Sequence, residues 1–380
     1  MTDGKIQMVD LKGQYARIKA EVDSAIGRVI DSCAFINGPA VTEFAENLRR
    51  YTGAGFVIPC ANGTDALQIA LMALGLEKGD EVIVPSFTYV ASAEVIAILG
   101  LRPVFADIDP ETFNIDVRNL DSAVTSRTKA IIPVHLFGHP CDMAAVMEFA
   151  GRHSLYVVED NAQSLGASCI FPDGTRKHTG TVGHFGCTSF FPSKNLGCYG
   201  DGGAMMTSDP ELAEKARMIA NHGQKTKYHH DIVGCNSRLD SIQAAILDVK
   251  LRYLDGYCEA RRKAAAYYRK GLEGTPGLVL PCEKEYGTHV YHQFTLRVAD
   301  GKRDGLKDFL ASEGIPSMVY YPLPLHRQKA YSVHAAGIGE RSLQYSEDAA
   351  SSVLSLPMHT ELTESVQDRI TAAVRKYMED

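Results

Sequence analysis

The sequence predicts an α/β fold: a large domain on a mixed, mostly parallel β-sheet, and a smaller α/β domain at the C-terminus. From about residue 56, short β-branched runs alternate with stretches of helical periodicity, the pattern of strands joined by crossover helices. The chain of 380 residues is too long for one small core and fits a large domain with a smaller partner. We expect residues 1–250 in the large domain, and residues 251–380 in a connecting helix and the small domain.

The first fifty residues are predicted to form two amphipathic helices. The second begins at Pro39, because proline is favoured in the first turn of a helix. These helices would pack on the large domain or reach a partner subunit. The predicted strands that follow are 57–60, 81–85, 103–107, 130–136 and 156–159, and the helices between them are 65–74, 92–99 and 143–152.

Glycine-punctuated strands are predicted between residues 183 and 207, and a long helical region between residues 239 and 272, with a break near Gly256. Apolar residues recur at helical spacing in this region, which is expected to connect the two domains. In the smaller domain, the predicted strands are 290–298 and 317–320, and the predicted helices are 303–313 and 363–378.

The composition excludes several classes of protein. With 45% hydrophobic and 22% charged residues the chain is globular, and no stretch approaches the roughly 18 apolar residues of a membrane helix. The N-terminus lacks a secretory signal, so we expect a cytoplasmic protein. Nine scattered cysteines without CxxC spacing predict reduced thiols and no metal site. A net charge of −7 without a basic run argues against nucleic acid as a partner.

The first segment that carries chemistry is 61–67, where a predicted strand ends in a turn of small residues and a helix begins. Free N–H groups and the helix dipole at such a point favour a phosphate group, and Thr64 adds a hydroxyl donor. A plain helix cap by Thr64 or Asp65 explains the same residues. Taken alone, this segment leaves both interpretations open.

The second segment, 157–164, places Asp160 at the carboxyl end of a predicted strand, the edge where open α/β sheets bind ligands. A carboxylate there can hold the protonated ring nitrogen of a pyridine cofactor. Considered alone, Asp160 would serve equally well as the cap of the following loop.

The third segment, 188–197, precedes a glycine-rich run at 200–203. It places Lys194 among aromatic and apolar neighbours, where desolvation lowers the pKa of an ammonium group and permits Schiff-base chemistry. Most lysines are solvated, so Lys194 without its neighbours would be assigned to the surface.

Five segments occur in a fixed order: ANGTDALQIAL, PSFTYVASAEVI, VEDNAQSLGA, TSFFPSKNLG and GCNSRLDSIQAAIL. Together they resemble the DegT/DnrJ/EryC1/StrS family of sugar-nucleotide aminotransferases, which have the aspartate-aminotransferase-like fold (PLP fold type I). The resemblance extends from about residue 30 to residue 360. It implies an enzyme that uses pyridoxal 5′-phosphate (PLP) and forms a homodimer with each active site at the subunit interface.

The resemblance also implies roles for individual residues. Lys194 matches the lysine that binds the cofactor covalently and then moves protons, and Asp160 matches the partner of the pyridine nitrogen. The other implied cofactor contacts are Gln163 at the phenolic oxygen, Gly63, Thr64 and Ser189 at the phosphate, Tyr89 on the ring face, and Asn236 donated by the other subunit.

The implied reaction moves an amino group from L-glutamate, leaving 2-oxoglutarate, to a keto nucleotide sugar. The segments YYPLPLH (320–326) and LPMH (356–359) resemble the branch that aminates C-3. That branch implies UDP-2-acetamido-2-deoxy-3-oxo-D-glucuronate or a related sugar, used for cell-surface polysaccharide or glycoconjugate synthesis. A dTDP-3-keto-6-deoxyhexose 3-aminotransferase and a C-4 sugar aminotransferase stay open as alternatives.

Three residues are the expected substrate contacts: Arg238, Tyr321 and His326. Arg238 would present a guanidinium group to the carboxylate of glutamate or of a uronate sugar. The histidine that matches His326 contacts the sugar in the C-3 branch, although an isolated histidine is as often structural.

Two alternatives belong to other classes. A nicotinamide-dependent dehydrogenase needs a GxGxxG turn after its first strand, and residues 57–67 contain none. A non-catalytic sugar-sensing relative would have damaged Lys194, Asp160 or Ser189, and all three are intact. Lys194 also disfavours the dehydrating members of the family, which have histidine at this position.

Overall fold

The computed structural model describes residues 5–335 and 342–379. Its α-helices are α1 (Leu11–Ser32), α2 (Pro39–Thr52), α3 (Gly63–Ala73), α4 (Ala91–Ile98), α5 (Met143–Arg152), α6 (Pro210–Ala220), α7 (Ser241–Leu251), α8 (Leu254–Leu272), α9 (Arg303–Ser312), α10 (Ser332–Ala335), α11 (Gln344–Ser352) and α12 (Glu364–Glu379). Its strands are β1 (Phe56–Cys60), β2 (Glu81–Pro85), β3 (Arg102–Ala106), β4 (Thr128–Ile131), β5 (Tyr156–Asp160), β6 (Ser168–Ile170), β7 (Arg176–His178), β8 (Phe185–Ser189), β9 (Gly203–Thr207), β10 (Gln224–Thr226), β11 (His229–His230), β12 (Leu278–Val279), β13 (Phe294–Val298) and β14 (Val353–Leu356).

Seven strands form one sheet in the order β1-β9-β8-β5-β4-β2-β3. The pairs from β8 to β3 are parallel, whereas β9 is antiparallel to both of its neighbours, β8 and β1. One strand therefore runs against the other six, and the sheet is mixed and mostly parallel. This arrangement confirms the predicted fold class.

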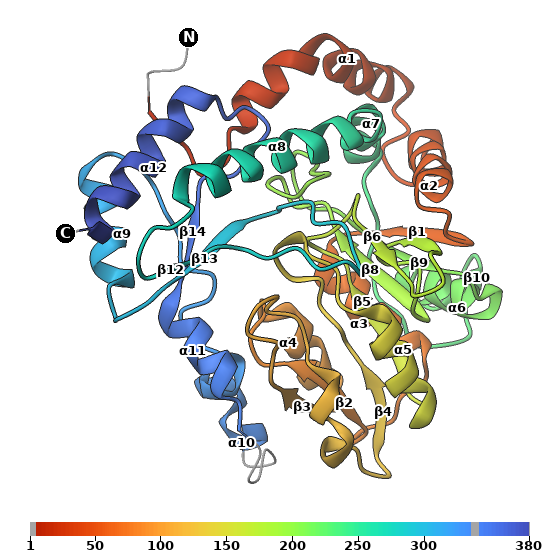
Figure 1. Ribbon diagram of the computed structural model, residues 1–380. Helices are drawn as coiled ribbons and strands as arrows, with labels where there is room; N and C mark the ends of the chain where they lie inside the picture. The colour runs from red at the N-terminus through yellow and green to blue at the C-terminus, as the bar shows by residue number, and fades with distance from the viewer. Residues whose placement is uncertain (1–4, 336–341, 380) are drawn as a thin grey trace.

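Helices cover both faces of the large sheet (Figure 1). On one face, α3, α4 and α6 pack against a set of strand residues that includes Val158. On the other face, α5 packs Phe149 against a set that includes Val157. Because successive strand residues point to opposite faces, Asp160 lies on the side of α3 and α4, and Glu159 lies on the side of α5.

The C-terminal part of the chain has its own core. A three-stranded antiparallel sheet, β12-β13-β14, packs against α8, α9 and α12. Tyr268 of α8 and Phe294 of β13 are fully buried there. Helix α8 runs from α7 toward this second core, so it connects the two parts of the molecule (Figure 1).

The two N-terminal helices pack on α7. Ile18 and Val22 of α1 are buried with Ile246, and Phe44 of α2 is buried with Leu247. Of the two interpretations left open for this region, the structure shows packing on the large domain.

Four predicted elements differ from the structure. The strand predicted over residues 290–298 begins only at Phe294, because Tyr291 has a positive φ of 46°. The helical region divides at residues 252 and 253, and Gly256 is helical, because one glycine near a helix start costs only about 1 kcal/mol. Strand β4 ends at Ile131, because Pro133 has no N–H group to give to the sheet. Residues 317–320, which have prolines on either side, form one isolated bridge between Met318 and Ser355.

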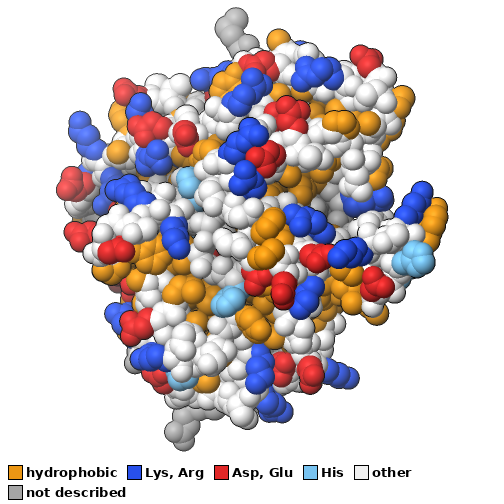
Figure 2. All heavy atoms as spheres, turned by 90° about the vertical axis from the view of Figure 1, so that its right-hand side faces the viewer, with side chains coloured by type: hydrophobic (Ala, Val, Ile, Leu, Met, Phe, Trp, Pro, Cys, Tyr) orange, Lys and Arg blue, Asp and Glu red, His pale blue; other side chains and the backbone are white. Residues whose placement is uncertain are grey.

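None of the helices within the described ranges is both long and apolar enough to cross a membrane. On the face shown in Figure 2, lysine and arginine side chains are mixed with aspartate and glutamate. No continuous basic area is visible on that face.

Candidate active site

A cavity of about 640 Å³ lies where β2, β5 and β8 end, beside the first turn of α3. The residues that line it come from segments far apart in the sequence. Those predicted from the sequence are Gly63, Thr64, Tyr89, Asp160, Gln163, Ser189, Lys194 and Tyr321. The fold therefore brings most of the expected cofactor contacts into one chamber.

The turn between β1 and α3 forms one wall of the cavity. Asn62 caps the helix, because its side-chain oxygen accepts the Asp65 N–H at 2.8 Å. The N–H groups of Gly63 and Thr64 in the first turn have no partner within the helix. A Cβ atom on Gly63 would lie 2.7 Å from the Ser189 Cβ, so glycine allows the end of β8 to approach the turn. The turn and Ser189 together form a cradle suited to a phosphate group.

Asp160 ends β5 and is 6% exposed. Its Oδ2 accepts a hydrogen bond from Ser92 Oγ at 2.7 Å, and its Oδ1 accepts one from the Ala162 N–H at 3.1 Å. A carboxylate offers about four acceptor positions. Asp160 therefore keeps acceptor capacity on the side of the cavity that it lines.

Gln163 is held at both ends of its amide. Its Oε1 accepts the Phe137 N–H at 2.7 Å, and its Nε2 donates to the Tyr321 hydroxyl at 3.2 Å. Burial raises the pKa of Tyr321, so this hydroxyl stays protonated. The ring of Tyr321 lies 6.1 Å from that of Tyr89, which is 56% exposed. One Nε2 hydrogen of Gln163 is left for another acceptor.

Lys194 lies in the segment between β8 and β9. Burial lowers the pKa of its amine to about 8, and the Asp160 carboxylate acts in the opposite direction. An ordinary lysine has a pKa of about 10.4. The amine of Lys194 is therefore available as a nucleophile or a base much closer to neutral pH.

Three expected contacts do not line this cavity. Asn236 is exposed and forms an isolated bridge with Asn221, and Arg238 is partly buried nearby. His326 is buried, with Nδ1 2.7 Å from Ser86 Oγ and Nε2 3.0 Å from Glu347 Oε1. Both ring nitrogens of His326 thus have partners within the protein, in an arrangement that joins the C-terminal part to the loop after β2.

Several residues of the cavity were not anticipated, and His292 is the most notable. It is 6% exposed, and its Nδ1 has no hydrogen-bond partner in the described part of the chain. Burial and the Lys194 charge lower the pKa of His292 well below its ordinary value, so its imidazole is neutral. Gln293 and Thr88 also line the cavity. Thr88 stands in the PSFTYVASAEVI segment, whereas no motif marks His292 and Gln293, which directly precede β13.

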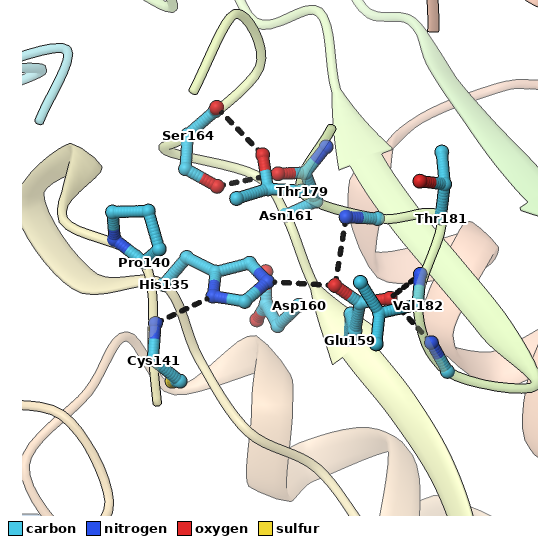
Figure 3. A network of polar contacts seen from close by, with 12 residues as sticks. His135, Pro140, Cys141, Glu159, Asp160, Asn161, Ser164, Thr179, Thr181 and Val182 are labelled. Atoms are coloured by element: carbon cyan, nitrogen blue, oxygen red, sulfur yellow. Dashed lines mark hydrogen bonds and ion pairs between the residues drawn. The ribbon is translucent and has the colours of Figure 1, made fainter. Parts of the chain in front are cut away.

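A second buried network lies directly behind Asp160, on the opposite face of β5 (Figure 3). Glu159 Oε2 accepts from His135 Nε2 at 2.9 Å and from the Gly180 N–H at 2.8 Å. Its Oε1 accepts the N–H groups of Val182 and Gly183, each at 2.7 Å. Since the Cys141 N–H donates to His135 Nδ1 at 3.0 Å, the ring proton of His135 lies on Nε2.

The chain is similar to several known proteins. It is 47% identical to a protein of Geobacillus stearothermophilus named pleiotropic regulatory protein, with 98% of each chain covered. It is 46% identical to UDP-2-acetamido-2-deoxy-3-oxo-D-glucuronate aminotransferase of Pseudomonas aeruginosa, with 97% of this chain and 99% of that protein covered. Its structure matches that of ntda from Bacillus subtilis with bound cofactor PMP, at a TM-score of 0.91 and 30% identity, covering 100% of this chain and 86% of that one.

The large sheet, with a lysine between β8 and β9 and an aspartate at the end of β5 lining one cavity, defines the class: an aminotransferase with the aspartate-aminotransferase-like fold (PLP fold type I). More narrowly, the chain belongs to the DegT/DnrJ/EryC1/StrS aminotransferase family, whose model matches residues 16–375. The resemblance seen in the sequence is thereby confirmed.

Proposed function

We propose that this protein is a PLP-dependent aminotransferase that moves an amino group from L-glutamate to C-3 of UDP-2-acetamido-2-deoxy-3-oxo-D-glucuronate or a related nucleotide sugar. The assignment of the reaction class rests on Lys194, whose amine has a lowered pKa and which lines the same cavity as Asp160. The Pseudomonas aeruginosa relative supports the sugar, because its name specifies that 3-oxo-glucuronate.

The residues of the cavity fit PLP. The cradle of Gly63, Thr64 and Ser189 suits its phosphate. Glycine at position 63 keeps the space between the turn and Ser189 that a Cβ atom would fill. Asp160 has acceptor capacity for the ring N–H. The free amide hydrogen of Gln163 suits the phenolic oxygen. Tyr89 would cover the ring, and Lys194 would bind the cofactor.

When bound, PLP supplies an electron-withdrawing ring that stabilises negative charge on the reacting carbon of the substrate. The chain supplies the rest. Lys194 Nζ would take the proton from that carbon and pass it to the C4′ carbon of the cofactor, which its pKa of about 8 permits. Asp160 would keep the ring nitrogen protonated through a charged hydrogen bond. The Ser92 hydroxyl fixes the orientation of Asp160.

We also propose that the enzyme works as a homodimer. Asn236 is exposed and Arg238 is only partly buried, and neither lines the cavity of its own chain. Both residues are therefore available to a second copy. In that position Asn236 would reach the partner's phosphate cradle, and Arg238 would meet a substrate carboxylate.

The test is to incubate the purified protein with PLP, L-glutamate and a panel of 3-keto and 4-keto nucleotide sugars, and to identify products by mass spectrometry and NMR. We expect amination of 3-keto sugars, with the glucuronate turned over fastest. Turnover of 4-keto sugars alone would contradict the C-3 assignment. Lys194→Ala is the matched control, and a Lys194→Ala protein that still transaminates would overturn the assigned role of the lysine.

A non-catalytic sugar sensor is the second candidate, because the Geobacillus stearothermophilus relative is named as a regulatory protein. Intact Lys194, Asp160 and Ser189 in one cavity argue for catalysis. Binding of a keto sugar without any amination in the same assay would instead favour the sensor.

A further inference from the structure

Ser237 stands in the GCNSRLDSIQAAIL segment between Asn236 and Arg238, and the structure places it against the phosphate cradle. It is 1% exposed, and its backbone N–H donates to the Ala220 carbonyl at 3.0 Å. Its hydroxyl donates to Asp65 Oδ2 at 2.6 Å and accepts the Ala61 N–H at 3.0 Å. One hydroxyl therefore bridges both ends of the turn from residue 61 to residue 65.

The hydrogen bond from Ser237 to Asp65 matters for phosphate binding, because Asp65 carries a negative charge beside the cradle. Asp65 lies in the first turn of α3 and lines the same cavity as Gly63 and Thr64. A carboxylate next to a bound phosphate repels it. Burial raises the pKa of the Cys235 thiol most, and the negative charge of Asp65 raises it further. The hydrogen bond from Ser237 directs this carboxylate toward the 235–238 segment.

The 235–238 segment is itself firmly attached to α6. The Cys235 N–H donates to the Ile219 carbonyl at 2.8 Å, and the Cys235 carbonyl accepts the His222 N–H at 2.8 Å. Asn236 pairs with Asn221 in an isolated bridge. The same short segment carries Asn236, Ser237 and Arg238, so a fixed Ser237 also fixes its two neighbours.

We propose that Ser237 is a positioning residue for the phosphate turn: its hydroxyl holds the Asp65 carboxylate away from a bound phosphate and ties the turn to the segment that carries Asn236 and Arg238. The inference rests on the proposed function, because the phosphate is that of PLP. Its consequence is a coupling in which PLP binding in the cradle stabilises the 235–238 segment.

The experiment titrates cofactor-free, full-length protein with PLP and, separately, with pyridoxal, which has no phosphate group. We expect Ser237→Ala to weaken PLP binding about tenfold, because the partly buried Asp65 carboxylate loses its donor. Pyridoxal binding should not change. Ser237→Thr keeps the hydroxyl and should restore PLP affinity, and Asp65→Asn in the Ser237→Ala background should restore most of it by removing the charge.

Ser241→Ala is the matched control, because Ser241 is equally buried and its hydroxyl accepts a backbone N–H, that of Gly38, at 3.1 Å. It should bind PLP as the wild type does. Hydrogen exchange supplies a second measurement: PLP should protect residues 232–238 in the wild type and not in Ser237→Ala.

Equal PLP affinity of Ser237→Ala and the wild type, with equal protection of residues 232–238, would overturn the inference and leave the proposed function intact. An equal loss of PLP and pyridoxal binding would also overturn it, since the defect would not concern the phosphate. A wild-type protein that takes up no PLP would instead contradict the proposed function itself.

Discussion

Glu159 and Asp160 are neighbours on β5, and their carboxylates have opposite surroundings. Glu159 is completely buried and accepts four hydrogen bonds, from His135 and from the N–H groups of Gly180, Val182 and Gly183. Asp160 accepts two hydrogen bonds and lines the cavity. The alternation of the strand sends one carboxylate to each face of the sheet.

The fold thereby separates a structural carboxylate from a functional one. A carboxylate has about four acceptor positions, and those of Glu159 are filled by the protein. Asp160 has positions left for a ligand. We therefore expect changes at Glu159 to lower stability and changes at Asp160 to lower activity.

Asp160→Asn should lower kcat by about 10²- to 10⁴-fold, because the ring nitrogen loses the partner that keeps it protonated. The free energy of unfolding should stay close to that of the wild type. Steady-state kinetics with glutamate and urea denaturation measure the two quantities. A variant that kept full activity would show that the reaction does not need the Asp160 carboxylate.

Glu159→Gln should lower the free energy of unfolding by about 2–3 kcal/mol, because an amide accepts fewer and weaker hydrogen bonds than the buried charge does. The activity of the protein that remains folded should be nearly unchanged. Urea denaturation is the measurement, with Asp160→Asn as the matched control. The opposite pattern, normal stability with lost activity, would show that Glu159 acts in the reaction.

Ser92→Ala removes one of the two donors to Asp160. We expect a loss of about 1 kcal/mol, seen as a roughly fivefold decrease in PLP affinity or kcat. Titration of the cofactor-free protein with PLP measures the affinity. Ser92→Thr retains the hydroxyl, and its failure to restore binding would indicate that packing, and not the hydrogen bond, matters at this position.

The smallest expected effect concerns the pKa of Lys194, which is about 8 in the wild type and which the charge of Asp160 raises. Removal of that charge in Asp160→Asn should move this pKa below 8, whereas Glu159→Gln should leave it unchanged. The pH dependence of Lys194 acylation in cofactor-free protein, followed by mass spectrometry, gives the pKa. Equal shifts in the two variants would show that the two carboxylates do not differ in their effect on Lys194.

The sign of the Lys194 shift also predicts a pH dependence of stability. In cofactor-free protein, where Lys194 is not bound to PLP, its amine has a pKa of about 8 in the folded chain and about 10.4 when unfolded, so the unfolded chain binds more protons between these values. The free energy of unfolding should therefore rise from pH 8 to pH 10.4 through this group. Lys194→Met should remove that rise from urea denaturation curves measured across this range.

Much of the fold could be predicted from the sequence, because its signals are local. Strand alternation and helical periodicity are visible within each segment, and the family motifs mark Lys194, Asp160 and the turn at Gly63. The break before α8 was misplaced, because glycine in a helix costs too little to decide a boundary. The domain boundary at residue 250 stays a prediction.

The rest of the site depends on contacts between distant segments. Glu159 and Asp160 are adjacent acids in the sequence, and nothing there shows that the donors to Glu159 come from residues 135 and 180–183. Ser237 reaches Asp65 across more than half of the large domain's sequence. His326 was expected at the sugar, and the structure surrounds its ring with Ser86 and Glu347.

The pairing of β1 with β9 has a consequence for how the protein is made. Within the described residues β1 pairs only with β9, which begins at Gly203, so a growing chain must carry its first strand unpaired through most of the large domain's synthesis. Domains generally fold as units during translation. β1 leads into the phosphate turn, and the Lys194 segment lies between β8 and β9. When β9 has left the ribosome and pairs with β1, the phosphate turn and the Lys194 segment would therefore take their final places together, late in synthesis.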